Sequence, residues 1–206
     1  KNFNISKNHK GSIILIGNFD GVHIGHQKLF KLAKLYQKKY NLKIGVINFD
    51  PMPKMFFNKN IKNFRLSSID QKVNLLKNHG VDFIITKKFD KTFSKIKSIN
   101  FIKNILSNKL KAKFIFVSNN FRFGNKREGD VKFLIQNEQT YNYQVIKPKP
   151  LLVNKQIISS SLIRNHLKNG YLERANKLLD RKWSIDGIVQ KGRQVGKKIG
   201  FPTCNI

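Results

Sequence analysis

Short apolar runs alternate with segments of helical periodicity along most of this chain, and this alternation restricts the fold more than any other feature. Residues 12–17 have the sequence SIILIG, a β-branched run that is typical of a buried strand. Residues 24–40 follow with apolar side chains at helical spacing, and residues 42–49 form a second apolar run. Strand, helix and strand in this order predict a βαβ unit with parallel strands and a right-handed crossover.

The same alternation continues to about residue 180. It predicts further strands at 81–86, 113–118 and 143–147. It predicts further helices at 68–78, 99–108, 130–137, 161–168 and 172–179. Ser68 and Gln71 have the spacing of a capping box, and Gly80 follows the end of that helix. Repeated βα units favour an α/β fold, a Rossmann-like doubly wound parallel sheet.

The pattern changes after Arg181. Residues 183–191 alternate between apolar and polar side chains, as a strand of an antiparallel sheet does, and glycines follow at 187, 192, 196 and 200. We therefore predict two domains, residues 1–182 with the parallel sheet and residues 183–206 with a different fold. The second segment is too short to form a core alone.

Composition narrows the class of protein. The 206 residues contain one cysteine, Cys204, which excludes an internal disulfide framework and a multi-cysteine zinc site and indicates a reducing compartment. No run approaches the roughly 18 to 20 apolar residues of a membrane-spanning helix. The sequence predicts a cytoplasmic protein without a membrane partner, and it carries no feature that sets an oligomeric state.

The formal net charge of +30 raises the question of nucleic-acid binding, since Lys and Arg neutralise phosphates. The cations are mostly Lys, however, and they are spread along the chain rather than gathered in one basic arm. Lys, Asn, Ile and Phe are all abundant, and these are the amino acids of A/T-rich codons. We favour compositional drift over selection for nucleic-acid binding, although a positive field would still attract anionic nucleotides.

The strongest chemical signal is GNFDGVHIGHQ at residues 17–27, where the first strand meets the first helix. Helix N-termini at the carboxyl ends of parallel strands bind anions, so a phosphate is the expected ligand. His23 and His26 lie three residues apart, on one face of the first helical turn, and could donate hydrogen bonds to phosphate oxygens in the transition state. We predict that both are catalytic. The predicted nucleotide-binding residues of this stretch are Gly17, Asn18, Phe19, Asp20, Gly21 and Gly25.

Two other interpretations of the histidines are weaker. A single histidine here would be better explained as a capping or surface residue, but two in this order after a strand and a glycine-bearing turn favour function. A metal site lacks His, Asp and Glu neighbours at useful spacing.

The stretch resembles the HIGH motif of the nucleotidyltransferase superfamily, and its fuller form resembles the FAD synthetase domain of bacterial bifunctional riboflavin kinase/FAD synthetases. Further segments are similar to that family in the same order. They are NFDPMP at 48–53, RLSS at 65–68, NFRFG at 120–124 with GD at 129–130, ISSSLIR at 158–164 and GFPTCN at 200–205. The last of these resembles the motif that opens the riboflavin kinase domain, a β-barrel. The resemblance extends from about residue 12 to the end of the chain.

The resemblance implies that the phosphate of FMN attacks the α-phosphorus of ATP, with FAD and pyrophosphate as products and Mg²⁺ bridging the phosphates without direct protein ligands. The attacking phosphate is already ionised near neutral pH, so no general base is needed. Hydroxyls, backbone N–H groups and a guanidinium converge where residues 159–164 begin a helix. We predict that Ser159, Ser160, Ser161 and Arg164 hold the β and γ phosphates of ATP.

A flat apolar wall would suit the isoalloxazine ring of the flavin. Phe49, Pro51, Pro53 and Phe56 could form it, although they could equally be core residues, and Asn120 and Arg122 are predicted to contact the nucleotide or the flavin. The sequence departs from the family pattern in a few places. Met52 stands where the family often has His, Asn120 where it often has Asp, and Ser118-Asn119 in place of a Gly-acid pair.

The resemblance matches Thr203 and Asn205 to positions that contact Mg²⁺ and ATP in riboflavin kinases. The rest of that domain, including its catalytic acid/base, has no counterpart in these 206 residues. Phosphorylation of riboflavin is therefore expected only of a full-length protein.

Two alternative functions remain open at this point. One is a related nucleotidyltransferase with another phosphorylated acceptor, such as pantetheine phosphate or nicotinamide mononucleotide, against which the NFDPMP and GFPTCN segments argue. The other is a basic nucleic-acid-binding protein, which would bind with steep salt dependence and would not turn over ATP.

Overall fold

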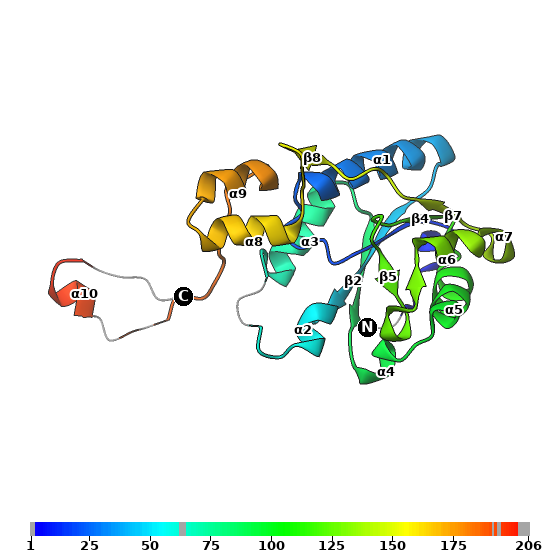
Figure 1. Ribbon diagram of the computed structural model, residues 1–206, viewed down its shortest axis with the longest axis horizontal. Helices are drawn as coiled ribbons and strands as arrows, with labels where there is room; N and C mark the ends of the chain where they lie inside the picture. The colour runs from blue at the N-terminus through cyan, green and yellow to red at the C-terminus, as the bar shows by residue number, and fades with distance from the viewer. Residues whose placement is uncertain (1–2, 62–64, 191, 193–194, 202–206) are drawn as a thin grey trace.

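A parallel sheet of five strands, in the order β3-β2-β1-β4-β7, forms the centre of the molecule (Figure 1). The computed structural model describes residues 3–61, 65–190, 192 and 195–201. The strands of the sheet are β1 (Ile13–Ile16), β2 (Ile44–Asp50), β3 (Phe83–Lys88), β4 (Phe114–Phe116) and β7 (Gln144–Ile146). Reversal of the strand order on either side of β1 gives the doubly wound arrangement that the sequence predicts.

Helices connect these strands, and short hairpins extend from them. The larger helices are α1 (Ile24–Tyr40), α3 (Ile69–Asn78), η2 (Phe101–Lys109), α6 (Val131–Gln136), α8 (Ser160–Lys168) and α9 (Leu172–Leu179). The shorter ones are η1 (Lys7–His9), α2 (Pro53–Phe57), α4 (Lys91–Ser94), α5 (Ser98–Asn100), η3 (Asn125–Arg127), α7 (Glu138–Tyr141) and α10 (Val195–Lys198). The hairpins pair β5 (Arg122–Phe123) with β6 (Gly129–Asp130), and β8 (Leu152–Val153) with β9 (Gln156–Ile157).

The sheet is covered by helices on both faces, which explains why β1 is apolar at every position. Ile13 and Leu15 pack against α1 and α3, while Ile14 and Ile16 pack against η2 and α6. Because successive side chains of a strand point to opposite faces, a strand covered on both sides packs apolar side chains against both layers of helices.

A third apolar cluster joins α8 and α9 to the segment that precedes α3. Leu66 is buried there among Ile163, Ala175 and Leu179. The helix pair thereby covers the carboxyl end of the sheet beside the start of α1, so that residues 158–164 approach residues 17–27 (Figure 1).

Most of the predicted elements are confirmed. Helix α1 and helix α9 have the predicted bounds, and the capping box of Ser68 and Gln71 forms with both of its hydrogen bonds. The predicted helix at 99–108 is present, but its main part, η2, is a π-helix with a wider turn. Its apolar residues still face the sheet, because Ile102, Ile105 and Leu106 are buried.

The predicted strand at 183–191 is wrong over the residues that the structure describes. Residues 183–189 form neither helix nor strand, and Gln190 makes only an isolated bridge. Ile185, Ile188 and Val189 are exposed. An alternating segment becomes a strand only when a neighbouring strand accepts its backbone hydrogen bonds, and no strand within residues 3–61 or 65–182 pairs with residues 183–189.

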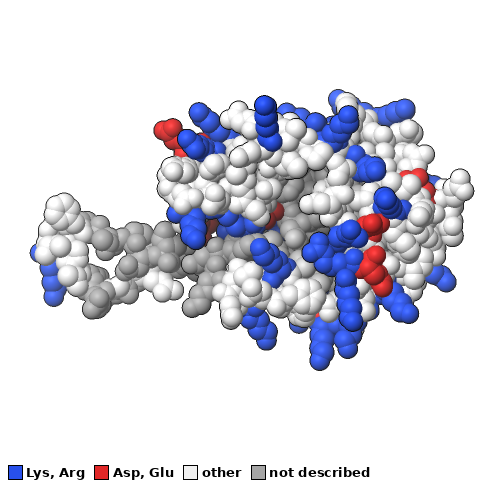
Figure 2. Space-filling model, viewed as in Figure 1, with Lys and Arg blue, Asp and Glu red and all other residues white. Residues whose placement is uncertain are grey.

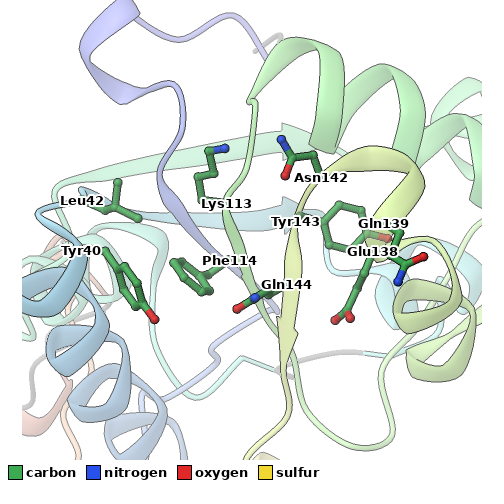
Figure 3. Close-up of a pocket in the computed structure, with 9 residues that line it drawn as sticks. All are labelled: Tyr40, Leu42, Lys113, Phe114, Glu138, Gln139, Asn142, Tyr143 and Gln144. Atoms are coloured by element: carbon green, nitrogen blue, oxygen red, sulfur yellow. The ribbon is translucent and has the colours of Figure 1, made fainter.

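The two ends of the sheet differ in whether a ligand is expected to bind there. At the amino ends of β4 and β7, a cavity of about 610 Å³ is lined by Tyr40, Phe114 and Gln144 among others (Figure 3). Ligands of open α/β sheets bind at the opposite end, outside the carboxyl ends of the strands. The candidate site therefore lies where the loops after β1 and β2 meet α8.

Charge and hydropathy agree with the sequence analysis. Lys and Arg are spread over the visible face of the molecule and do not form a single basic arm (Figure 2). Within the described part of the chain, no helix is long and apolar enough to cross a membrane.

Candidate active site

The loop between β1 and α1 is held in an unusual backbone conformation. Phe19, Gly21 and Val22 all have positive φ angles, of 46°, 78° and 42°. Only glycine adopts this region without strain, so burial of the Phe19 and Val22 side chains in the core offsets the cost at those two positions. The buried side chains of Phe19 and Val22 anchor the loop, and the backbone of residues 17–23 therefore lies at the start of α1.

The two histidines of this loop face each other at the first turn of α1. His23 is the N-cap residue, and its ring stacks on that of His26 with 3.7 Å between ring centroids and 20° between ring planes. The predicted common face is thus confirmed. The Nδ1 atoms of both rings are buried and have no hydrogen-bond partner among the described residues.

The environment keeps both imidazoles neutral. Burial, then the charges of Arg164 and Arg181, lowers the pKa of His23 from 6.5 to about 4. Burial, then His23, lowers the pKa of His26 well below its ordinary value. A neutral imidazole has one N–H donor and one acceptor, so each ring can donate one hydrogen bond to an anion without carrying a charge.

The lowered pKa of His23 makes protein stability depend on pH. Between pH 6.5 and about 4 the unfolded chain binds a proton at this residue and the folded chain does not, so stability falls as the pH falls through this window. The shift corresponds to about 3 kcal/mol. Urea unfolding near the two ends of this pH window should show that, on acidification, the free energy of unfolding falls by about 3 kcal/mol more in the wild type than in His23→Gln. Parallel pH dependences of the two proteins would contradict the assignment.

Gly25 provides the space that the His23 ring occupies. A Cβ atom at this position would lie 3.1 Å from Nδ1 and 3.2 Å from Cε1 of His23. Alanine is the better helix former by up to about 1 kcal/mol, which offsets the cost of displacing the ring, so Gly25→Ala should change the free energy of unfolding by less than about 1 kcal/mol. The displaced ring should lower turnover about tenfold. Thermal unfolding and turnover measured on the same preparation separate the two effects, and unchanged turnover would show that the ring position is unimportant.

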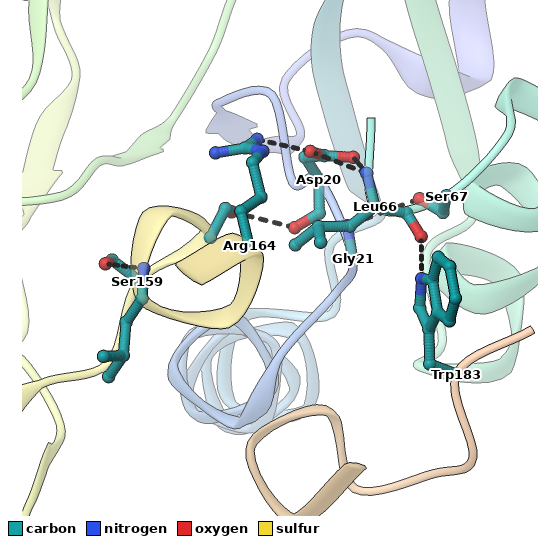
Figure 4. A network of polar contacts seen from close by, with 9 residues as sticks. Asp20, Gly21, Leu66, Ser67, Ser159, Arg164 and Trp183 are labelled. Atoms are coloured by element: carbon teal, nitrogen blue, oxygen red, sulfur yellow. Dashed lines mark hydrogen bonds and ion pairs between the residues drawn. The ribbon is translucent and has the colours of Figure 1, made fainter. Parts of the chain in front are cut away.

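Asp20 connects the loop to two other parts of the chain (Figure 4). Its buried carboxylate accepts the backbone N–H of Leu66 at 3.0 and 3.1 Å and pairs with Arg164, with 2.5 Å between Oδ2 and Nη2. Its backbone carbonyl accepts a hydrogen bond of 2.9 Å from the hydroxyl of Ser160. Gly21 donates its N–H to Ser67 at 3.3 Å. The three sequence segments at 17–23, 65–68 and 158–164 therefore form one site.

The serines predicted to hold phosphates have different environments. Ser159 accepts the N–H of Leu162 and caps α8, Ser160 bonds to Asp20, and Ser161 is exposed. Arg164 lies beside the loop, where the predicted anion would sit, and its Asp20 contact is the one shown in Figure 4. The side chain of Asp20, predicted as nucleotide-binding, is directed at protein groups instead.

Three polar residues near the loop were given no role by sequence reasoning, although two of them begin the NFDPMP and RLSS segments. Lys72 on α3 is buried, and burial lowers the pKa of its ammonium group while Asp20 raises it. Arg65 pairs with Asp50 at the end of β2. Asn48 is fully buried in β2, and neither atom of its amide has a hydrogen-bond partner in the described structure. A lysine within a helical pattern carries no sign of burial, so no local signal points to Lys72.

An aromatic cavity of about 860 Å³ adjoins the loop, a volume within the range of small-molecule sites. Its walls are phenylalanine rings from β2, α2, residues 89–93, η2 and residues 121–123, with Phe121 stacked on Phe123 at 5.4 Å and Phe49 packed against Phe93 at 5.6 Å. Cationic side chains line it as well: Lys54, Arg122, Lys126 and Arg127. Asn18 lines this cavity and is also part of the loop that carries the histidines.

The structure brings only some of the predicted flavin contacts to this cavity. Phe49, Pro53 and Arg122 line it, whereas Pro51 and Asn120 do not, and Phe56 lies behind it against Phe57 and Phe89. Asn120 accepts a hydrogen bond from Ser118. Sequence reasoning assigned no flavin contact to six further lining residues, of which the last two belong to the NFRFG segment: Phe57, Phe89, Phe93, Phe101, Phe121 and Phe123. The abundance of phenylalanine was the available signal, but nothing in the local pattern assigned these residues to one cavity.

Within the described residues, no group of three or more His, Cys, Asp or Glu side chains gathers where it could hold a metal ion. The histidine pair does not fit a metal site, because the carboxylate nearest to the loop, Asp20, is already bonded to Leu66 and Arg164. The predicted kinase-domain contacts Thr203 and Asn205 lie outside the described residues.

Comparison with known families gives two matches along the chain. The family model of FAD synthetase matches residues 5–162, and the model of riboflavin kinase matches residues 179–206.

Curated relatives carry both activities in their names. A bifunctional riboflavin kinase/FMN adenylyltransferase of Buchnera aphidicola (subsp. Schizaphis graminum) is 43% identical over 98% of this chain and 65% of its own length. The proteins of the same name from Escherichia coli K12 and Haemophilus influenzae are 34% and 35% identical over 96% of this chain. The chain spans 63% and 64% of those two relatives.

A solved structure has the same fold over nearly the whole chain. It is named a macrolide-efflux protein from Streptococcus pneumoniae, and it superposes with a TM-score of 0.81 at 28% identity over 95% of this chain and 64% of its own.

Proposed function

Because the chain belongs to the FAD synthetase family, we propose that it transfers the AMP group of ATP to FMN, with FAD and pyrophosphate as products. One observation supports this most directly. Asn18 lines the aromatic cavity and belongs to the loop of His23 and His26, so the cavity and the loop meet at a single residue. A reaction between a flavin phosphate and a nucleotide phosphate needs its two binding regions to adjoin in this way.

The aromatic cavity is the proposed flavin site. The isoalloxazine ring is flat and largely apolar, and the phenylalanine rings provide matching surface. The cations Arg122, Lys126 and Arg127 at the same cavity suit the phosphate of FMN, which carries negative charge near neutral pH.

The loop of residues 17–23 is the proposed site of the ATP phosphates. A phosphate there would meet the start of α1, whose N-cap His23 makes no side-chain capping bond, so the helix dipole faces the ligand. The two imidazoles would each donate a hydrogen bond, and Arg164 would add a positive charge beside them.

In the proposed reaction an oxygen of the FMN phosphate bonds to the α-phosphorus of ATP, and the bond from that phosphorus to the bridging oxygen of the β-phosphate breaks. Pyrophosphate leaves with the electron pair of the broken bond, and no proton has to be removed from the nucleophile. The chain's own residues contribute by aligning the two phosphates and by hydrogen-bonding the charge that builds on the transferred group. Mg²⁺ would enter as the counter-ion of the substrate MgATP.

The direct test is incubation of the purified protein with MgATP and FMN, followed by chromatography. FAD and pyrophosphate formed in equal amounts are the expected products. Parallel reactions with pantetheine phosphate and with nicotinamide mononucleotide test the alternative acceptors, and turnover of one of these in place of FMN would overturn the proposal.

Phe57 allows the flavin site to be tested with little risk to folding. It lines the aromatic cavity yet is 70% exposed, so Phe57→Ala should not change the free energy of unfolding noticeably. Loss of one stacking surface should weaken FMN binding about tenfold, measured by quenching of flavin fluorescence. Leu35→Ala is the matched control, since Leu35 is 63% exposed on α1 and does not line the cavity. Equal FMN affinities of Phe57→Ala and Leu35→Ala would show that the flavin does not bind in the aromatic cavity.

Riboflavin phosphorylation is proposed only for the full-length protein, whose kinase domain would begin in the segment matched at residues 179–206. We also propose a domain boundary near residue 182. A cytoplasmic location is proposed as well, because one cysteine and 41 cationic residues suit a reducing compartment with anionic metabolites.

A further inference from the structure

The segment that follows α9 touches the proposed adenylyl-transfer site at several points, although the family model that matches it is that of riboflavin kinase. Arg181 donates from Nη1 to the carbonyl oxygen of Gly21 at 2.8 Å. This carbonyl belongs to the loop with positive φ angles, two residues before His23. The same Nη1 atom lies 3.3 Å from the carbonyl oxygen of Leu179.

Trp183 reaches a second part of the site. Its indole N–H donates to the carbonyl oxygen of Leu66 at 2.9 Å, and the N–H of Leu66 is the group that holds the carboxylate of Asp20 (Figure 4). The backbone N–H of Trp183 is itself fixed by Asn176 of α9 at 2.7 Å. The backbone of Leu66 is therefore held at its N–H by Asp20 and at its carbonyl oxygen by Trp183.

Two further contacts complete the connection. Gln27 of α1 donates from Nε2 to the carbonyl oxygens of Val22 and Leu179, each at 3.2 Å. Gln71, which forms the capping box of α3, donates from its Nε2 to the carbonyl oxygen of Ser184 at 3.2 Å. The segment 179–184 is thus bonded to α1, to the loop before it and to α3.

We propose that Arg181 and Trp183 are positioning residues for adenylyl transfer, which fix the backbone of Gly21 and Leu66 and, through it, the loop of His23 and the carboxylate of Asp20. The inference rests on the function proposed above. It means that residues from the segment matched by the riboflavin kinase model, 179–206, support the backbone of the proposed FAD synthetase site. Arg181 is half-buried and its donor meets a carbonyl of the strained loop, so the contact opposes relaxation of that loop.

The test is a comparison of kcat and KM for FAD formation in variants of the whole protein. Arg181→Met keeps the length of the side chain but removes its donors, and Trp183→Phe keeps the ring in the apolar cluster but removes the N–H. We expect kcat to fall about tenfold in the first and about threefold in the second, with the KM for FMN changed less than about twofold. Arg181→Lys, which retains a donor, should recover most of the loss.

Arg174→Met is the matched control, because Arg174 is an exposed arginine of α9 whose guanidinium lies over Tyr171. It should leave kcat unchanged. A purely structural role of the segment predicts lower thermal stability of Arg181→Met and Trp183→Phe but an unchanged kcat per folded molecule, and this result would overturn the proposal. Failure of the proposed function is distinguishable, since the unaltered protein would then form no FAD.

Discussion

Replacing either His23 or His26 by alanine is expected to lower kcat for FAD formation by about 10²- to 10³-fold, the usual cost of removing one donor to a developing negative charge. The buried Nδ1 atoms of both rings make no hydrogen bond to the described residues, so the substitutions break no polar contact of those atoms within the fold. Folding should therefore suffer far less than turnover.

The stacked rings should act as a unit. With 3.7 Å between their centroids, displacement of one ring removes the support of the other. The double variant should consequently be little slower than the worse single variant. Turnover and urea unfolding are the two measurements, and His166→Ala in the last turn of α8 is the control. Retention of kcat within about threefold in both single variants would contradict the assignment.

Replacing Asp20 by alanine should have the largest effect on stability, a loss of about 3 to 5 kcal/mol in the free energy of unfolding. The substitution removes the acceptor of the Leu66 N–H and the counter-charge of Arg164 in a buried environment. Asp20→Asn keeps an acceptor without the charge and should lie between the wild type and Asp20→Ala.

An exposed ion pair provides the comparison for Asp20. Lys43 pairs with Asp82 at 3.2 Å, and the lysine side chain is 55% exposed. Lys43→Ala should therefore cost less than about 1 kcal/mol. Equal losses in Asp20→Ala and Lys43→Ala, measured by urea unfolding, would show that the Asp20 network is no more than a surface contact.

Local signals in the sequence were sufficient for the sheet and for the histidine pair. Helix α1 has its predicted bounds because its apolar residues recur at helical spacing between a glycine-rich turn and Asn41, which ends the helix in a left-handed conformation. The stacking of His23 on His26 follows from their spacing of three residues at the first turn.

Features that depend on distant segments could not be predicted. The aromatic cavity is lined by phenylalanines from positions 49 to 123, and no local sequence pattern predicts that these residues lie close together in the fold. The carboxylate of Asp20 was assigned to a nucleotide, but its partners come from residues 66 and 164, which only the tertiary fold brings close. Residues 183–191 alternate as a strand does, yet hydrogen-bonding neighbours decide whether such a segment becomes one.

The hydrogen bonds of Trp183 and Ser184 bear on where the chain can be truncated without loss of contacts to the proposed site. A recombinant fragment ending at residue 182 would contain the whole phosphate loop but would lack the indole donor to Leu66 and the acceptor for Gln71. A fragment ending after residue 184 would retain both. A cut at residue 182 should therefore weaken the proposed adenylyl-transfer site, whereas a cut only two residues further along the chain should leave it intact.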